Sequence, residues 1–356
     1  MNILSKSEFN YLILKIIERK SLSSSEQEIL KTFTPHSNYP FTYNQEPDLY
    51  REKLNLLPLI YPSLKKILQQ LNFTESENYV TTIWFFWLPL ALELANLYQQ
   101  KSHPIIMGIL GGQGTGKTTI TKILSLIWQY LNLSSVAISL DDLYKTYQDR
   151  KELLKLDSRL IWRGPPDTHD VKLGLDVLTA LKNRQYPVSI PRFDKSLHQG
   201  RGDRISGEIV NHADIIIFEG WFVGVKPVEE EVFKNPPPPI ITKSDRTFAL
   251  DCNRRLKEYL PLWEKLDYLM ILNPDDYRYS LKWRIEAEQK MIAQGKTGMN
   301  SQEIEEFVFY FWKALHPEIF IKPLIENPQS VNLVANIDTN HQVNQILKPS
   351  ELHTNT

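Results

Sequence analysis

The sequence predicts an α/β fold in which helices flank a central parallel sheet, preceded by a helical N-terminal extension. Three observations support this prediction. Short β-branched runs alternate with helical patterns from about residue 104 onward, a glycine-rich loop follows the first of these runs, and the earlier residues place apolar side chains at helical spacing. Near-continuous apolar strands that alternate with helices are typical of a parallel sheet covered on both faces.

The composition fits such a fold and argues against some kinds of partner. Of the 356 residues, 42% are hydrophobic and 23% are charged, which is enough apolar sequence for a large buried core. The formal net charge of -1 gives no global field that would attract nucleic acid or an anionic membrane, so we expect neither as a partner. The single cysteine, Cys252, cannot form an intramolecular disulfide, which suits a reducing compartment.

The first third of the chain, residues 1–103, is predicted to be mostly helical. Apolar residues recur at helical spacing in two stretches, the first of which contains Leu12, Ile13, Ile16 and Ile17. Residues 33–62 are rich in proline, asparagine and tyrosine, so we predict an irregular segment there. We find no chemical motif in this region and interpret it as a helical cap on the core.

The longest apolar run, residues 83–92, is interrupted by Pro89. A membrane-spanning helix needs about 20 apolar residues, so we interpret this run as a buried helix. The first 20 residues show neither a secretory pattern nor an arginine-rich transit pattern. We therefore expect a cytoplasmic protein.

Residues 104–345 contain the runs from which we predict the sheet domain. Its core strands are predicted at residues 105–110, 136–140, 215–218, 268–272 and 331–337. Helices are predicted at residues 117–131, 248–266 and 276–321. Residues 346–356 are expected to form a polar, frayed tail.

A phosphate-binding loop follows the first predicted strand. Residues 111–118 match the pattern G-x-x-x-x-G-K-[ST] in full, and the strand before them and the helix after them make the match far more specific than the pattern alone. The candidate nucleotide-binding residues are Gly111, Gly112, Gln113, Gly114, Thr115, Gly116, Lys117, Thr118 and Thr119. We therefore predict a P-loop NTPase fold that binds ATP.

The residue types in this loop suit the chemistry of phosphate binding. Glycines allow backbone angles that let several N–H groups converge on the β- and γ-phosphates, beside the positive end of a helix dipole. Lys117 supplies a mobile positive charge, and Thr118 offers a hydroxyl to a metal ion. We therefore predict that ATP binds together with Mg²⁺.

Two acidic residues stand at the ends of predicted core strands. Asp141 follows the strand at 136–140, and Glu219 follows the strand at 215–218. Ligands of open parallel sheets bind beyond the carboxyl ends of the strands, where the phosphate-binding loop also lies. We predict that Asp141 accepts the proton of a substrate hydroxyl and that Glu219 organises Mg²⁺, although these two roles could be exchanged.

A candidate substrate pocket is predicted in two turn-rich segments, residues 163–170 and 191–204, which we interpret as loops between core elements. Because a guanidinium grips a carboxylate with two parallel hydrogen bonds, the arginines here favour an anionic substrate, with Arg192 and Arg204 as the first candidates. His169 is either a substrate contact or a satisfied turn histidine. The candidate substrate-binding residues are Arg163, His169, Arg192, Asp194, Lys195, Arg201 and Arg204.

A lid-like segment is predicted at about residues 280–300. Four basic residues lie on or near one predicted helix that breaks at Gly295, namely Lys282, Arg284, Lys290 and Lys296. A mobile basic segment that closes over the phosphates would exclude water from the reaction. We predict Arg284 as a catalytic contact, and a solvated helix face is the alternative interpretation.

Together these motifs resemble those of the plant and cyanobacterial glycerate 3-kinases, within the group of uridine kinase, phosphoribulokinase and pantothenate kinase. The resemblance covers about residues 104–340. It is carried by residues 111–119, 139–144, 163–164, 168–170, 191–196, 200–204 and 218–221. Residues 283–284, 287–288 and 298–299 are similar to the family's lid. The Phe-Asp-Lys-Ser and Gly-Arg-Gly-Asp-Arg segments, at residues 193–196 and 200–204, are its most specific parts.

The resemblance implies phosphoryl transfer from ATP to the 3-hydroxyl of D-glycerate, a reaction that closes photorespiration in photosynthetic organisms. One departure touches the expected substrate loop, since Pro-Pro-Asp at residues 165–167 stands where the family often has Asn-Ala or Asn-Pro-Gly. Exact substrate identity therefore depends on the site itself.

Two other functions are compatible with the motifs. One is a kinase of the same group that acts on another small alcohol, such as a nucleoside or pantothenate, and the arginines of residues 192–204 argue against it. The other is a non-catalytic protein that uses ATP as a switch, which would not need a base such as Asp141 beside an anion-binding loop. Whether the kinase acts on glycerate or on another small alcohol, we expect a small-molecule substrate and no obligate protein partner.

Overall fold

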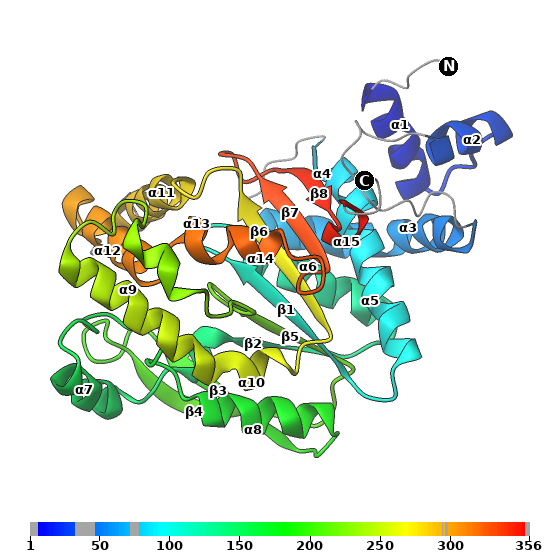
Figure 1. Ribbon diagram of the computed structural model, residues 1–356. Helices are drawn as coiled ribbons and strands as arrows, with labels where there is room; N and C mark the ends of the chain where they lie inside the picture. The colour runs from blue at the N-terminus through cyan, green and yellow to red at the C-terminus, as the bar shows by residue number, and fades with distance from the viewer. Residues whose placement is uncertain (1–5, 33–46, 72–77, 294, 296–297, 353–356) are drawn as a thin grey trace.

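The computed structural model describes residues 6–32, 47–71, 78–293, 295 and 298–352, and within these residues a six-stranded sheet lies between two layers of helices (Figure 1). In spatial order the strands are β2 (Ser135–Ser139), β5 (Ile215–Gly220), β1 (Ile105–Gly111), β6 (Tyr268–Pro274), β7 (Leu333–Ile337) and β8 (Val343–Leu347). The first five are parallel, and β8 is antiparallel to β7. The predicted central parallel sheet flanked by helices is confirmed.

Alternate residues of each core strand face opposite helical layers. In β1, Ile105, Met107 and Ile109 belong to one hydrophobic cluster, whereas Ile106 and Leu110 belong to the other. Since successive side chains of a strand point to opposite faces, a strand that is buried on both faces must be apolar at nearly every position. This is why continuous β-branched runs identified the core strands.

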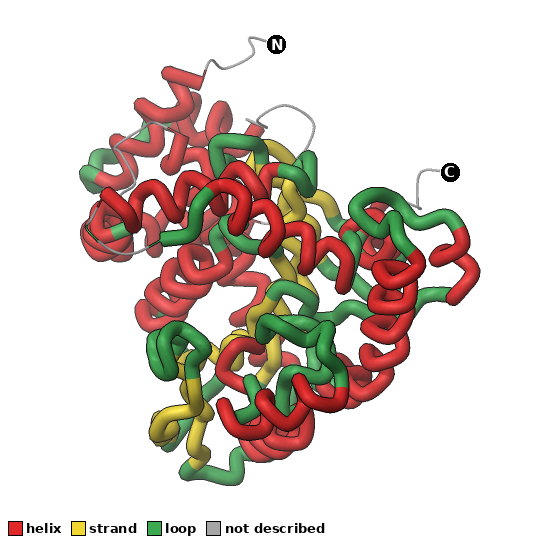
Figure 2. Tube along the Cα trace, turned by 90° about the vertical axis from the view of Figure 1, so that its left-hand side faces the viewer, coloured by secondary structure: helices red, strands yellow, loops and turns green. Residues whose placement is uncertain are grey.

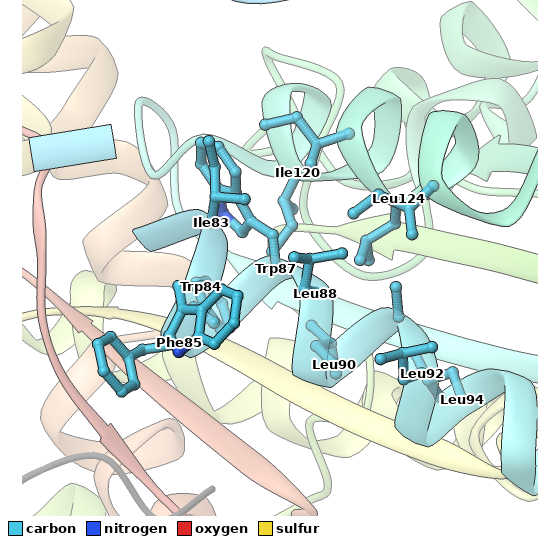
Figure 3. Close-up of a cluster of buried hydrophobic side chains, with 14 of the residues drawn as sticks. Ile83, Trp84, Phe85, Trp87, Leu88, Leu90, Leu92, Leu94, Ile120 and Leu124 are labelled. Carbon is cyan, nitrogen blue, oxygen red and sulfur yellow. The ribbon is translucent and has the colours of Figure 1, made fainter. Parts of the chain in front are cut away.

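Helices of the N-terminal region cover one face of the sheet. They are α1 (Lys6–Ile17), α2 (Ser24–Thr32), α3 (Pro47–Gln70), α4 (Asn78–Thr82), a π-helical turn (Ile83–Trp87) and α5 (Leu88–Gln100), and α6 (Lys117–Tyr130) lies in the same layer. Figure 3 shows Trp87 and Leu88 beside Ile120 and Leu124 of α6. The N-terminal region therefore packs directly onto the layer that carries the phosphate-binding loop.

Within the described part of the chain, Tyr79–Gln100 is the one stretch long and apolar enough, by length and composition alone, to cross a membrane. However, 72% of its apolar window is buried inside the protein. The core helix of an α/β protein has the same composition, because it is surrounded by other apolar elements. We therefore interpret this stretch as a core element of the first layer.

Helix α3 corrects the prediction of an irregular segment at residues 33–62. Residues 47–62 are helical even though Pro58 and Pro62 lie inside the helix, and residues 33–46 lie outside the described residues. Each proline removes one backbone hydrogen bond. Buried apolar residues at helical spacing offset that loss, namely Leu56, Leu57, Ile60 and Leu64.

A second helical layer covers the opposite face of the sheet. It consists of α8 (Val171–Lys182), α9 (Lys243–Arg255), α10 (Leu260–Trp263), α13 (Pro317–Phe320) and α14 (Lys322–Ile325). Helix α9 begins earlier than predicted because Thr242 and Asp245 form a capping box at its start. Figure 1 shows α8, α9 and α10 on the side of the sheet away from α3 and α5.

A two-stranded hairpin projects from the main body (Figure 2). Strand β3 (Val188–Asp194) pairs antiparallel with β4 (Asp203–Val210), and residues 195–202 form the turn between them. This corrects the prediction that the whole of residues 191–204 is loop. Strand β4 mixes polar residues with the exposed Ile205 and Ile209, so no continuous apolar run marks the strand in the sequence.

The remaining elements lie beyond the carboxyl ends of the parallel strands or close the chain. A short 3-10 helix (Leu140–Leu143) and α7 (Tyr147–Leu156) follow β2, whereas α11 (Tyr279–Ala293) and α12 (Ser301–Ala314) follow β6 (Figure 1). The predicted tail is partly structured, since β8 and α15 (Pro349–Leu352) continue past residue 345. Ile346 is fully buried and anchors β8 to the core, whereas Asn344 and Gln345 in the same strand are polar, and this mixed pattern concealed the strand.

Candidate active site

The phosphate-binding loop lies between β1, which ends at Gly111, and α6, which begins at Lys117. Gly114 and Gly116 have φ angles of 84° and 88°, in the left-handed region that glycine adopts without strain. A Cβ atom on Gly114 would also lie 2.9 Å from the side chain of Trp283 in α11. The loop's shape therefore requires both glycines, and α11 packs directly against it.

The side chain of Lys117 is folded onto this loop. Its Nζ donates to the carbonyl oxygens of Gly111 at 2.7 Å and Gly112 at 3.1 Å, and it lies 4.0 Å from Oε2 of Glu219. Burial lowers the pKa of Lys117, while the negative charges of Glu219 and Asp141 act in the opposite direction. The ammonium is thus held where the phosphates of a nucleotide would lie on the loop.

A cavity of about 670 Å³ opens beside the loop. Such a volume is large enough for a small acceptor together with part of a nucleotide, since ligand pockets span about 300–1,000 Å³. The polar end of the cavity brings together residues from the loop, the strand ends and the β3–β4 turn, namely Gly112, Gln113, Gly114, Lys117, Thr118, Asp141, Arg163, Lys195 and Glu219. Both predicted acids therefore face the cavity that the loop lines.

Asp141 sits in the 3-10 helix after β2, where two donors engage its carboxylate. The hydroxyl of Tyr144 donates to Oδ1 at 2.8 Å, and Nζ of Lys195 donates to Oδ2 at 2.6 Å. Burial opposes the charge on Asp141, but Lys195 and Tyr144 outweigh this effect and hold the pKa of Asp141 below its usual range. The carboxylate is thus ionised at neutral pH and can accept a proton.

The neighbouring acid, Asp142, has a structural role. Its Oδ2 accepts from the backbone N–H of Ser139 at 3.0 Å, while the Ser139 hydroxyl accepts from the N–H of Asp141 at 3.3 Å. These two bonds form a capping box that fixes the turn after β2. Asp142 therefore orients the segment that presents Asp141, and it does not line the cavity.

Thr118 and Glu219 are the residues that suit a Mg²⁺ ion. Both line the cavity, Thr118 from the first turn of α6 and Glu219 from the end of β5, and both offer the oxygen atoms that Mg²⁺ prefers. Among the described residues, no group of three or more histidines, cysteines or acids could hold a metal ion by itself. This donor set fits an ion that one or two protein oxygens share with nucleotide phosphates.

His169 lies behind the cavity wall. Its side chain is buried, its Nδ1 is 2.8 Å from the Tyr259 hydroxyl, and its ring stacks on Tyr144 with centroids 4.7 Å apart. Burial lowers the pKa of His169 to about 3, so the ring is neutral. Of the two roles considered for this residue, the structure places it as a packed support for Tyr144, out of contact with the cavity.

Arg192 and Arg204 do not line the cavity, and protein acceptors engage both guanidinium groups. Arg192 donates to Asp142 at 2.9 Å and to Glu208 at 2.6 Å. Arg204 donates to the carbonyl of Tyr144 at 2.8 Å and to a carboxylate oxygen of Asp170 at 3.0 Å. The two arginines that we first assigned to a substrate carboxylate therefore connect the hairpin to the segment after β2 and to the start of α8.

The β3–β4 turn presents Lys195 and is held by its neighbours. Asp194 accepts from the N–H and the hydroxyl of Ser196 at 2.8 and 2.6 Å. Arg163 donates to the carbonyls of Gly200 at 2.8 Å and Arg201 at 3.1 Å. Among these predicted substrate-binding residues, Arg163 and Lys195 line the cavity, whereas Asp194 and Arg201 contribute to the turn.

Arg284 lines the cavity from α11. It pairs with Glu288 one turn further along the helix, and its guanidinium lies 5.1 Å from the ring centroid of Phe307 in α12. Lys282 points elsewhere, since its Nζ donates to the Thr339 hydroxyl at 2.9 Å. Lys296, another predicted lid residue, lies outside the described residues.

Comparisons with known proteins agree with this architecture, although no family model matches the chain. The chloroplastic D-glycerate 3-kinase of Arabidopsis thaliana is 31% identical over 259 residues, which are 68% of this chain and 54% of that protein. An uncharacterized kinase of Schizosaccharomyces pombe is 34% identical over 220 residues, 59% of this chain and 79% of that protein. This chain belongs to their family of P-loop kinases. The predicted family resemblance is confirmed.

A solved structure extends the likeness from the sequence to the fold of these P-loop kinases. The D-glycerate 3-kinase of Cryptococcus neoformans superposes with a TM-score of 0.65 at 25% identity, covering 72% of this chain and 96% of that one. The chain spans about half the length of the Arabidopsis relative. The similarity therefore says nothing about the other half of that protein.

Sequence reasoning missed the apolar end of the cavity in this P-loop kinase. That end is formed largely by aromatic side chains from α12, from the segment after β5 and from the loop between α7 and α8, namely Trp162, Trp221, Phe222, Phe307, Phe311 and Trp312. Phe311 also packs against Gly164, where a Cβ atom would lie 2.3 Å from its ring. Aromatic residues at helical spacing are typical of an ordinary core face, so the sequence gave no signal that these would line a pocket.

Proposed function

We propose that the protein is an ATP-dependent kinase that transfers the γ-phosphoryl group of ATP to the 3-hydroxyl of D-glycerate. The observation that carries this proposal is the pairing of Asp141 with Lys195 at the polar end of the cavity, beside the phosphate-binding loop. A base and a cation at adjacent positions suit an acceptor whose hydroxyl and carboxylate are a few bonds apart. The Arabidopsis and Cryptococcus relatives, both named D-glycerate 3-kinases, support the same acceptor.

The proposed reaction uses Asp141 as the base. Asp141 accepts the proton of the acceptor hydroxyl, the hydroxyl oxygen forms a bond to the γ-phosphorus, and ADP leaves with the electron pair of the broken P–O bond. Lys117 and the backbone N–H groups of the loop bind the β- and γ-phosphates and stabilise the charge that develops on them. Arg284, which faces the same cavity, is suited to contact the phosphoryl group from the side of α11.

Thr118 and Glu219 would hold the Mg²⁺ ion, which supplies neutralisation of the phosphate charge when it is bound. Arg163 and Lys195 are the cations that face the acceptor end of the cavity, and we assign the substrate carboxylate to them. A nucleoside or pantothenate has no carboxylate or carries it far from the reactive hydroxyl. A small hydroxy acid therefore fits this end of the cavity better than either alternative acceptor.

A coupled ADP-release assay tests the proposal with D-glycerate, L-glycerate, glycerol, uridine, pantothenate and ribulose 5-phosphate as acceptors. We expect the highest kcat/KM with D-glycerate. In a folded Lys117→Ala variant, we expect turnover to fall by several orders of magnitude, because we assign this lysine to the phosphates. The fold should persist, since the Lys117 ammonium contacts loop carbonyls and not the core. Higher turnover with uridine or pantothenate would assign another acceptor, and acceptor-independent ATP hydrolysis alone would favour a nucleotide switch.

We also propose a cytoplasmic location for the protein. The single cysteine, Cys252, is free and buried in the second layer, and burial raises the pKa of its thiol well above the usual range. Such a thiol is inert and compatible with a reducing compartment. Fractionation of cells that express the tagged chain tests this proposal, and recovery in the membrane or organelle fraction would contradict it.

A further inference from the structure

The carboxylate of the proposed base is covered by its own neighbour. Lys195 donates to Oδ2 of Asp141 at 2.6 Å, while Tyr144 donates to Oδ1 at 2.8 Å, so each oxygen already has a donor. Each oxygen keeps a second lone pair, but a base must present a lone pair toward the substrate, and the Lys195 ammonium competes for that position because Lys195 and Asp141 line the same cavity. The Tyr144 hydroxyl is buried in the wall, whereas the Lys195 side chain is 59% exposed. Lys195 is therefore the donor that can move.

We propose that Lys195 covers the base until the carboxylate of the acceptor draws it away, so that the acidic substrate itself exposes Asp141. The proposal rests on the proposed function, because it assumes an acceptor that carries both a carboxylate and a hydroxyl. The ammonium exchanges one carboxylate partner for another, and Oδ2 of Asp141 becomes free for the substrate hydroxyl. Lys195 would thus act in specificity as well as in binding.

The surroundings of Lys195 suit such an exchange. Its backbone is fixed by the turn, which Asp194 and Arg163 stabilise through the contacts described above. Only the flexible four-carbon side chain has to move, and a lysine ammonium reorients among acceptors more easily than a planar guanidinium. Exchanging one charge-assisted hydrogen bond for a similar one changes the free energy little. The fixed turn and the mobile head group together make the movement local.

Glycerol would not gain this advantage. It has hydroxyl groups like those of glycerate but no carboxylate, so it would have to break the ion pair between Lys195 and Asp141 without replacing it. The site would therefore discriminate against neutral alcohols even where they fit the cavity. Glycerol would lose the contact of its missing carboxylate and would also have to break the ion pair between Lys195 and Asp141. Simple carboxylate binding predicts only the first of these losses.

The proposal is tested by supplying the hydroxyl and the carboxylate on separate molecules, glycerol and formate. Glycerol phosphorylation is measured in the wild type with and without formate, with chloride at equal ionic strength as the control for salt effects. We expect formate to raise kcat/KM for glycerol at least about threefold, because formate would draw Lys195 away from Asp141. In Lys195→Ala the base is already uncovered, so we expect no stimulation by formate.

The same variant gives a second readout. We expect Lys195→Ala to lower kcat/KM for D-glycerate at least about tenfold, as for loss of a charge-assisted contact, while kcat/KM for glycerol rises. Lys172→Ala is the matched control, since it removes an exposed lysine paired with Asp176 away from the cavity, and we expect it to change neither value.

Three outcomes would overturn the proposal. These are no stimulation of the wild type by formate, a parallel loss of turnover with glycerate and glycerol in Lys195→Ala, or a raised KM for ATP in that variant without a change in the preference between acceptors. Failure of the proposed function would look different, because the wild type would then not phosphorylate D-glycerate at all.

Discussion

The hydroxyl of Tyr144 donates to Oδ1 of Asp141 over 2.8 Å, and the Tyr144 ring stacks on the neutral imidazole of His169. Burial raises the pKa of Tyr144 well above its usual range, so the phenol remains a donor throughout the physiological pH range. The contact fixes Oδ1 of the proposed base, while Oδ2 accepts from Lys195. Tyr144 is therefore a positioning residue for Asp141.

From this contact we predict that Tyr144→Phe lowers kcat about tenfold, since a hydrogen bond to a charged group contributes about 1.5–3 kcal/mol and part of it is replaced by solvent. The KM for ATP should change little, because the phosphates bind elsewhere. Tyr186→Phe is a control for the loss of a partly buried hydroxyl, as its contacts to Ala213 lie away from the cavity. An equal fall of kcat in both variants would contradict the assignment of Tyr144 as a positioning residue for Asp141.

Arg192 is expected to affect stability more than specificity. Its removal would leave Asp142 partly buried without its guanidinium partner, so we predict that Arg192→Ala destabilises the protein by about 1–3 kcal/mol. Thermal unfolding should show this as a lower Tm, while the preference for D-glycerate over glycerol stays unchanged. A preference that shrank tenfold at constant Tm would instead restore the sequence-based assignment of Arg192 to the substrate carboxylate.

The burial of Lys53 in the N-terminal layer should make the free energy of unfolding depend on pH. Its side chain is 1% exposed, its ammonium lies 4.1 Å from the ring centroid of Trp84, and burial lowers its pKa to about 7. The unfolded chain protonates this amine below its ordinary pKa of 10.5, whereas the folded chain resists protonation until the pH approaches 7. The folded state is therefore penalised as the pH falls from about 10 to 7.

We predict that Lys53→Met raises the free energy of unfolding by about 1–3 kcal/mol at pH 7, because loss of the contact with Trp84 offsets part of the gain. The gain should shrink as the pH rises toward 9.5. Chemical denaturation at pH 7, 8 and 9.5 measures it, and Lys172→Met is the matched control on an exposed lysine. A destabilised Lys53→Met protein at pH 7 would mean that the lysine is charged and well solvated in the folded state.

The fold was predictable where one physical cause dominated the sequence. Strands such as β1 are buried on both faces and are therefore apolar throughout, and the glycine pattern of residues 111–116 needs a strand before it and a helix after it. The hairpin of β3 and β4 was not predictable, because it is stabilised by polar contacts such as that of Arg204 with Asp170. Helix α3 was missed because its two prolines carry a strong local signal that tertiary packing overrides.

The candidate site also has a part that the sequence predicts and a part that it does not. Residue types identified Lys117, Asp141 and Glu219, since strand ends and loop meet at one edge of a parallel sheet. Residue types could not tell Arg163, which faces the cavity, from Arg192, whose guanidinium is engaged by Asp142 and Glu208. That distinction depends on which acceptors lie nearby in space, and those acceptors come from distant parts of the chain.

The most direct test of the account is the rate at which Asp141→Asn converts D-glycerate and ATP to 3-phosphoglycerate, followed by ³¹P NMR beside the wild type. Asparagine keeps the shape of the side chain but cannot accept the proton at neutral pH. We predict that the wild type forms 3-phosphoglycerate, that kcat falls by about 10²–10⁴ in the variant, and that the KM for ATP stays within about threefold. A variant that kept kcat within about tenfold of the wild type would contradict the assignment of Asp141 as the base.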